Sequence, residues 1–173
     1  MDDEILIKEF KKGNKRAFEE LVKRYQRRVY SLCYRMVRNY EDSADLTQEV
    51  FVRVYKGLKR FRFKSSLWTW IYRITLNLCI SFSKSKKRAS LQNSLFPHPP
   101  TPQESYRREE LRKAVDKAIL SLPSQQRAVF IMHYYEDMKY KEIAEVMGCK
   151  LGTVKVHYFQ AIRRLRELLK EWV

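Results

Sequence analysis

The chain has 173 residues, enough for one ordinary domain or two small ones. Its 36 lysines and arginines outnumber its 20 aspartates and glutamates, so the formal charge is +16. This surplus favours a polyanionic partner, either a phosphate backbone or an acidic membrane surface, over a merely soluble basic surface. The acidic start is unlike a secretory signal, and no run approaches the roughly 20 apolar residues of a membrane span. We therefore expect a cytoplasmic protein without membrane insertion.

Apolar residues recur at three- and four-residue steps from Phe18 to Met36 and predict a long amphipathic helix. A second helix is expected to start near Ser43, where Asp or Ser offers an N-cap, and to run through Leu58. A third is expected from Ser65 or Ser66 to about Ser85.

The next segment, residues 86–101, is rich in serine and proline and cannot bury enough apolar surface to order itself. A capping box is expected where Thr101 and Glu104 follow it, with a helix to about Leu120. Pro123 is expected to begin another helix, and two more surround "EVMGCKLGT". No segment alternates cleanly enough to be a strand.

The expected fold class is therefore all-α, with two small helical domains joined by a flexible linker. We place the first domain at residues 1–88, the linker at 89–103 and the second domain at 104–173.

Motifs for disulfides, metal binding or catalysis are absent from the sequence. Cys33, Cys79 and Cys149 lie far apart without CxxC spacing, and we interpret each as a buried thiol in a reduced cytosol. The three histidines lack metal-ligand spacing, and His133 in an apolar run is interpreted as structural. No GxxxxGK loop, nucleophile elbow or HExxH motif occurs. We expect no enzyme activity, no metal and no cofactor.

The C-terminal half has the pattern of a helix-turn-helix. Gly148 can end one helix in the left-handed conformation, and Ala144 is small enough for close packing of the next helix. One apolar face is expected from Ile143, Ala144 and Met147, and the other from Val154, Tyr158, Ile162 and Leu165. The outward face would carry basic and amide groups that suit the major groove. Two packed helices with a solvated face are the alternative.

Three motifs in register resemble one family. "LPSQQRAVFIMHYYEDMKYKEIAEVMGCKLGTVK" is similar to the C-terminal domain of bacterial extracytoplasmic-function sigma factors. "ADLTQEVFVRVY" resembles their polymerase-docking helix, and "FRFKSSLWTWIYRITLNLCI" resembles their promoter-melting segment. The resemblance implies an alternative sigma factor that binds RNA polymerase core, recognises promoters through both domains and helps to open DNA. It also implies an anti-sigma factor as partner; no homo-oligomer is expected.

The melting segment lies in an acid-free window. Between Glu49 and Glu104 there are nine aromatic and eleven basic residues but no acid. Bases pulled from a duplex need surfaces on which to stack, and their phosphates need cations. We interpret Phe61 and Trp70 as core. The expected minus-ten contacts are Arg62, Phe63, Lys64, Ser65, Ser66, Trp68, Tyr72, Arg73, Asn77 and Lys84. The family often has Gly and an acid at Phe63 and Lys64, and Asp at Ser81.

A small acidic patch is unusual on so basic a chain. Asp45, Gln48, Glu49 and Val52 recur at three- and four-residue steps, and the resemblance implies that they meet the clamp helices of polymerase core. Acidic residues that merely stabilise the first helical turn are the alternative.

The recognition helix departs most from the family, which usually has Ser-Arg after Gly-Thr-Val-Lys and another Arg three residues on. The expected minus-thirty-five contacts in double-stranded promoter DNA are Lys150, Thr153, Lys155, His157, Gln160, Arg163 and Arg164. Gln160 is expected to pair with an adenine edge.

Two other functions are weighed against a sigma factor. "GTVKVHYFQAI" also resembles the recognition helix of LuxR-type transcriptional regulators, but that class leaves the docking and melting motifs unexplained. A nuclease would need clustered acids for metal ions, which the acid-free window does not provide.

Overall fold

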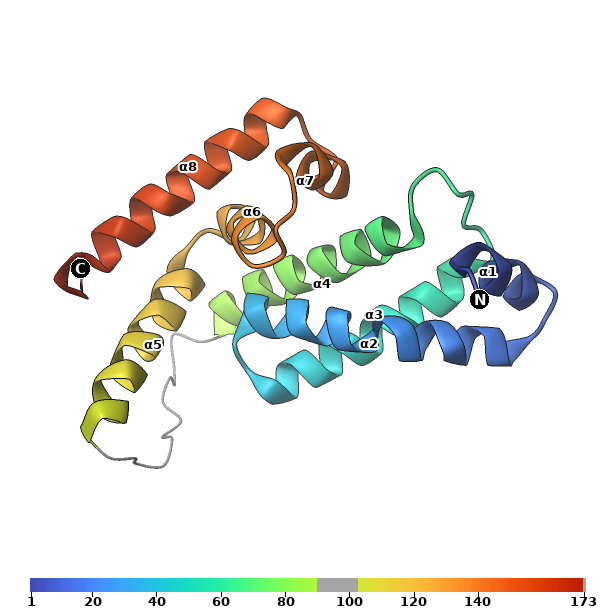
Figure 1. Ribbon diagram of the computed structural model, residues 1–173, viewed down its shortest axis with the longest axis horizontal. Coiled ribbons are helices and arrows are strands. Elements are labelled where there is room, and N and C mark those ends of the chain that lie inside the picture. Colours follow the sequence, from blue (N-terminus) through green and yellow to red (C-terminus); the bar gives the residue numbers. More distant parts are fainter. Residues whose placement is uncertain (90–102, 173) are drawn as a thin grey trace. The chain divides into compact units, whose positions relative to one another are not determined.

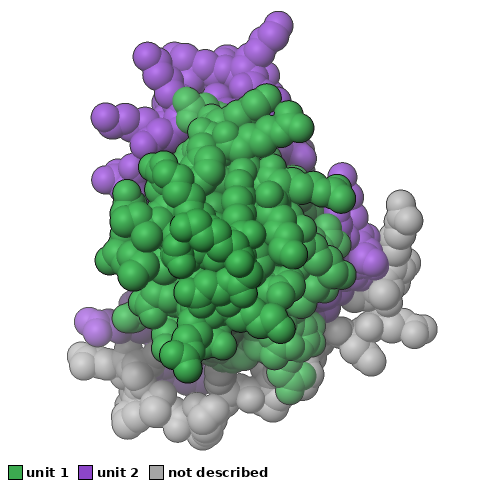
Figure 2. Space-filling view, turned by 90° about the vertical axis from the view of Figure 1, so that its right-hand side faces the viewer, with its two compact units in different colours: residues 1–79, 145–147 green, residues 80–144, 148–173 purple. Residues whose placement is uncertain are grey.

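The computed structural model describes residues 1–89 and 103–172, and its regular structure in these ranges is helical. The chain divides into two compact units, residues 1–79 with 145–147 and residues 80–144 with 148–173 (Figure 2). The all-α prediction is confirmed. Residues 90–102, which contain most of the expected linker and the Thr101 cap, lie outside the described residues. The exact domain boundaries therefore stay a prediction.

Four helices form the N-terminal half: α1 (Asp3–Lys11), α2 (Lys15–Val37), α3 (Tyr40–Leu58) and α4 (Leu67–Ala89) (Figure 1). Helix α1 packs against α2, and α2 packs against α3. The sequence analysis missed α1, although its Leu6, Ile7 and Phe10 are all buried.

Helix α3 begins three residues before the expected start. The side chain of Asn39 accepts a hydrogen bond from the backbone N–H of Asp42 at 2.9 Å and so caps the helix. Ser43 is buried inside the first turn, where its hydroxyl donates to the Asn39 carbonyl. The expectation that the helix starts near Ser43 is therefore wrong.

Helix α4 begins where it was expected. The Ser66 hydroxyl accepts from the backbone N–H of Thr69 at 3.0 Å, so this serine acts as the cap. The helix runs to Ala89, beyond the expected end near Ser85. Its last turn therefore occupies positions 86–89, which had been interpreted as the start of the linker.

The C-terminal half contains α5 (Gln103–Ser121), α6 (Ser124–Tyr134), α7 (Tyr140–Met147), α8 (Leu151–Leu168) and a 3₁₀ turn (Lys170–Trp172). Helix α6 packs against α8. The expected helix-turn-helix is present as α7 and α8, and Gly148 ends α7 with a φ of +64°. Val154 and Leu165 are buried as expected, and Val146 and Ala161 join them, which the sequence analysis missed.

An aromatic cluster joins these helices. His133 of α6 stacks on Tyr140 and meets Tyr158 edge-on, with ring centroids 4.5 and 4.6 Å apart. The Nδ1 atom of His133 lies 2.9 Å from the carbonyl oxygen of Met138. These contacts explain the structural role expected for His133.

Two of the three cysteine predictions hold. Cys33 and Cys79 are fully buried, whereas Cys149 is half-buried because it lies in the turn between α7 and α8. No described helix is long and apolar enough to cross a membrane.

Candidate nucleic-acid interface and docking surface

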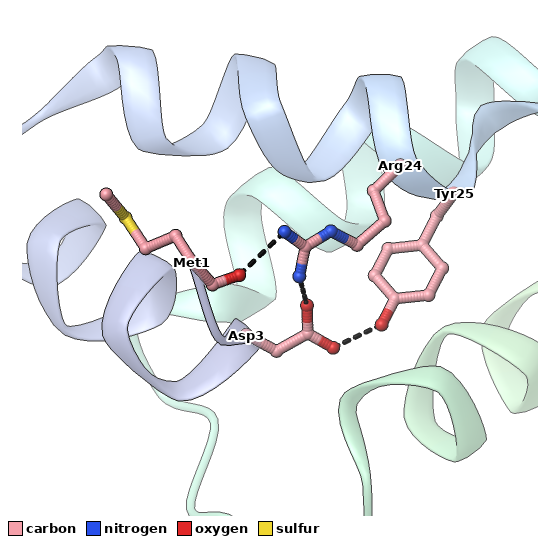
Figure 3. Close-up of polar contacts among 4 residues, drawn as sticks. All are labelled: Met1, Asp3, Arg24 and Tyr25. Atoms are coloured by element: carbon pink, nitrogen blue, oxygen red, sulfur yellow. Dashed lines mark hydrogen bonds and ion pairs between the residues drawn. The ribbon is translucent and has the colours of Figure 1, made fainter.

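The first turn of α1 is fastened to α2. The carboxylate of Asp3 accepts hydrogen bonds from the Arg24 guanidinium and the Tyr25 hydroxyl, and Arg24 also donates to the Met1 carbonyl at 2.7 Å (Figure 3). Burial, and then the hydrogen bond to Asp3, raises the pKa of Tyr25 well above its usual value. The Tyr25 ring is therefore held neutral and fixed in position.

Tyr25 in turn positions the start of α4. The ring of Trp68 stacks on Tyr25 at 5.5 Å with only 9° between the planes, and the Arg28 guanidinium lies 3.9 Å from the centre of the Trp68 ring. Trp68 remains half-buried, so part of its ring faces solvent beside a cation.

The loop before α4 presents Phe63 in an unusual conformation. Its φ is +58°, a left-handed value that glycine adopts freely and other residues adopt at a cost. The ring is 43% exposed, meets Phe61 edge-on at 5.1 Å, and has the Lys11 ammonium 5.1 Å from its centre. Lys11 also donates to the Phe61 carbonyl at 2.7 Å, which ties the loop to α1. The Phe63 ring is thus exposed to solvent, and its contacts with Phe61 and Lys11 fix its position.

Most other predicted minus-ten residues are accessible. Exposed side chains include Arg62, Lys64, Ser66, Arg73, Asn77 and Lys84, and Ser65 is half-buried. Phe61 is buried as predicted, but Trp70 is only half-buried against Gly57, so its assignment to the core was too strong.

Tyr72 corrects the sequence analysis. It is 1% exposed, and its ring meets Trp68 edge-on at 5.0 Å. Helical spacing puts it on the inner side of α4 beside Ile71, so the prediction that it contacts DNA is wrong for this structure.

The expected docking residues lie on one exposed face of α3. Asp45, Gln48, Glu49 and Val52 are all exposed, whereas Leu46, Val50 and Val54 are buried beneath them. Glu49 pairs with Arg53 at 3.0 Å, so part of the acidic patch is already neutralised.

The same face borders an apolar groove that the sequence did not reveal. The groove has a volume of about 430 Å³ and lies between α2 and α3. Its lining includes Phe18, Val22, Phe51 and Tyr55, together with the predicted Gln48 and Val52. Phe18 and Val22 follow the apolar period of α2, which from sequence alone made them look like ordinary core residues.

On the helix-turn-helix, most of the predicted readers are exposed. Lys150, Thr153, Lys155, Gln160, Arg163 and Arg164 are exposed on or next to α8. His157 is half-buried, and its Nδ1 atom is buried with no hydrogen-bond partner in the described part of the chain. His157 therefore lies at the flank of the helix and not on its free face.

Gln160 is already engaged. Its side-chain carbonyl accepts a hydrogen bond from the Gln126 amide at 2.9 Å, and Gln126 is 7% exposed. A bidentate pair with adenine would need both ends of the Gln160 amide. The Gln160 oxygen has a second lone pair and its NH2 group is not used by Gln126, so such a pair would have to form at the orientation that the contact with α6 imposes.

Comparison with known proteins decides the family. The model of Sigma-70 region 2 matches residues 21–89, and that of Sigma-70, region 4 matches residues 112–165. The ECF RNA polymerase sigma-E factor of Escherichia coli is 32% identical over 174 residues, which are 93% of this chain and 91% of that protein. The chain belongs to the sigma-70 family, as an ECF-type sigma factor.

A second relative agrees with this assignment, and a solved structure agrees with the fold. The ECF RNA polymerase sigma factor SigW of Bacillus subtilis is 30% identical over 178 residues, 95% of each protein. The sigma factor RpoE of Bartonella quintana, solved in complex with the anti-sigma factor NepR, shares the fold with a TM-score of 0.67 at 22% identity. That likeness covers 88% of this chain and 96% of that one.

This sigma factor directs promoter recognition by RNA polymerase and is not an enzyme, as the sequence analysis predicted. The LuxR-type alternative is set aside, because the region 2 match spans the docking and melting motifs that such a regulator would leave unexplained.

Proposed function

We propose that this sigma factor binds single-stranded minus-ten DNA with the loop of residues 62–66 and the exposed face of α4. The observation that carries this proposal is Phe63, an exposed ring held at a left-handed φ in a segment without acids. A base that leaves the duplex gains roughly 1–3 kcal/mol by stacking on such a ring.

Cations complete this surface. Arg62 and Lys64 flank the ring, and Arg73 and Asn77 are exposed on the first turns of α4. Phosphates of the displaced strand would meet no carboxylate within this window of the sequence, so attraction is not offset locally.

The proposed docking site for polymerase core is the face of α3 together with its apolar groove. Asp45 and Glu49 offer the only acids between Asp42 and Glu104, which suits a basic partner surface. The groove offers apolar area beside these charges, where Val52 is 43% exposed and Tyr55 is 40% exposed. Apolar area at the centre with charges at the edge is the common composition of protein interfaces. The clamp helices of the polymerase are the proposed occupant.

The proposed upstream contact is the free face of α8 in the major groove of the minus-thirty-five element. Lys155, Arg163 and Arg164 are exposed and can hold phosphates. Because Gln126 donates to the Gln160 oxygen, the proposed role of Gln160 as a base reader depends on the amide orientation that this hydrogen bond sets.

An anti-sigma factor is a further proposed partner. The Bartonella relative was solved with one, and the groove beside α3 offers a surface that a regulator can occupy in place of polymerase. We place all of these interactions in the cytoplasm, where the polymerase acts.

Run-off transcription with polymerase core, with and without the protein, tests the proposal. Promoter-specific transcripts should need the protein. A variant with Phe63, Lys64 and Asn77 changed to Ala should assemble into holoenzyme but give fewer transcripts, with Lys23→Ala as a control for loss of an exposed cation. Unchanged thymine reactivity to permanganate at the start site in the triple variant would contradict the role of the loop.

A further inference from the structure

The free face of α8 carries two exposed apolar side chains at its centre. Val156 is 54% exposed and Phe159 is 68% exposed. At 100° per residue, Val156 lies on the opposite side of the helix from the buried Val154 and Leu165. Val156 therefore points away from the packed domain, and Phe159, about one turn further on, is exposed at the border of a groove that Tyr158 and Ile162 also line. We call these two side chains the apolar stripe.

Cations outnumber acids around the stripe. Residues 146–166 contain five lysines and arginines, of which Lys155 lies next to Val156 and Arg163 lies two turns further on. The nearest acid after the stripe, Glu167, lies eight residues beyond Phe159, about 12 Å along the axis. It borders the same groove as Phe159 but is paired with Arg163 at 3.6 Å. A polyanion can therefore approach this face closely.

An apolar group on such a face has one matching feature in the major groove. Every base edge there presents hydrogen-bond donors or acceptors, and only thymine adds a methyl group, at C5. Apolar side chains contact this methyl, and its burial removes apolar area from water.

Nearby polar groups are less free to read bases. The Gln160 carbonyl is held by Gln126, and His157 is turned toward the flank of the helix. Val156 and Phe159, by contrast, are exposed, and within the described residues neither side chain takes part in a hydrogen bond or a ring contact.

We infer that Val156 and Phe159 select thymine in the upstream promoter element by contacting its 5-methyl group. This inference rests on the proposed binding of α8 in the major groove of that element. It adds a specificity that hydrogen bonds do not supply.

The test compares thymine with uracil, which lacks only the methyl group. Holoenzyme is first used to select its preferred upstream sequence from promoter duplexes with a randomised minus-thirty-five element. Each thymine of the selected site is then replaced singly by uracil, and binding is measured for the wild type, Val156→Ala, Phe159→Ala and Lys155→Ala.

We expect one or two thymines at which uracil lowers wild-type affinity about fourfold, which corresponds to about 0.8 kcal/mol for one buried methyl group. The ratio of thymine to uracil affinity should fall to about one in Val156→Ala or Phe159→Ala, each at the thymine that the replaced side chain contacts. Val156→Ile should preserve it. Lys155→Ala should weaken thymine and uracil duplexes equally and keep the ratio, because a phosphate contact does not sense the methyl.

Two outcomes would overturn the inference while leaving upstream binding intact. In one, the wild type binds thymine and uracil duplexes equally at every position. In the other, the ratio of thymine to uracil affinity is unchanged in both Ala variants. Failure of the proposed function looks different: selection would return no preferred upstream sequence, and Lys155→Ala would not alter binding. Because Val156 and Phe159 are exposed, their Ala variants are expected to fold, which circular dichroism checks.

Discussion

Replacement of Phe63 by Gly and by Ala separates the backbone strain of this residue from the use of its ring. A left-handed conformation costs a non-glycine residue about 1–2 kcal/mol. The ring recovers roughly 0.5–1.5 kcal/mol by its edge-on contact with Phe61 and about 0.5–1 kcal/mol from the Lys11 ammonium.

Both variants lose these two contacts, but only Gly removes the strain. Phe63→Ala should therefore lower the free energy of unfolding by about 1–2.5 kcal/mol. Phe63→Gly should be more stable than Phe63→Ala by about 0.5–1 kcal/mol, because relief of strain exceeds the greater chain entropy of glycine. Both should lose promoter opening by about 5- to 150-fold if one base stacks on the ring.

Stability is measured by urea unfolding of the full chain. Pulsed hydrogen exchange on peptides from α2 and α3 reports the unfolding of the half that contains the loop. Permanganate reactivity of the start-site thymines measures opening with the same proteins. Equal free energies of unfolding for the Gly and Ala variants would contradict the backbone strain at position 63. Wild-type opening by either variant would refute the use of the ring.

The remaining predictions concern docking, pH and the α6–α8 contact. Changing Asp45 and Glu49 together to Lys should weaken capture of polymerase core while the circular dichroism spectrum stays that of the wild type; capture at wild-type strength would contradict the docking surface. Since the pKa of Tyr25 is raised on folding, its contribution to stability is complete below about pH 10 and is lost as the pH rises further. Tyr25→Phe should therefore show a shallower loss of stability between pH 10 and 12, and an identical slope would argue against the buried hydroxyl. Gln160→Ala leaves the buried Gln126 amide without its acceptor and should cost about 1 kcal/mol in chemical unfolding, compared with Lys155→Ala as an exposed control.

The sequence was sufficient for features that depend on periodicity. The apolar spacing of α2 and the docking helix gave most of the buried faces, although Phe18 and Val22 line a groove. Gly148 marked the turn before α8. The family assignment followed from motifs whose order along the chain is itself informative. Each of these motifs is a short stretch of sequence, so a single sequence is enough to detect it.

What the sequence did not give depends on distant partners. Asn39 and Ser43 both have suitable chemistry for an N-cap, and only the fold shows which one meets a free N–H. Tyr72 was assigned to DNA because α4 is apolar on more than one side, and only the packing shows that Tyr72 belongs with the buried Leu76 and Cys79. The hydrogen bond between Gln126 and Gln160 joins residues 34 positions apart and has no pattern in the sequence.

The position of Trp68 has a practical consequence. Tryptophan fluorescence depends on the solvent, charges and rings around the indole. Trp68 is half-buried and contacts Tyr25 and the Arg28 guanidinium, directly after the loop that carries Phe63. The chain has three tryptophans, and the other two are Trp70 on the same helix and Trp172 near the C-terminal end. In a protein with Trp172 changed to Phe, all of the tryptophan emission would come from Trp68 and Trp70 at the start of α4. Binding of unpaired bases at this segment should then change the intensity or wavelength of the tryptophan emission. The change can be followed in real time and without an attached dye.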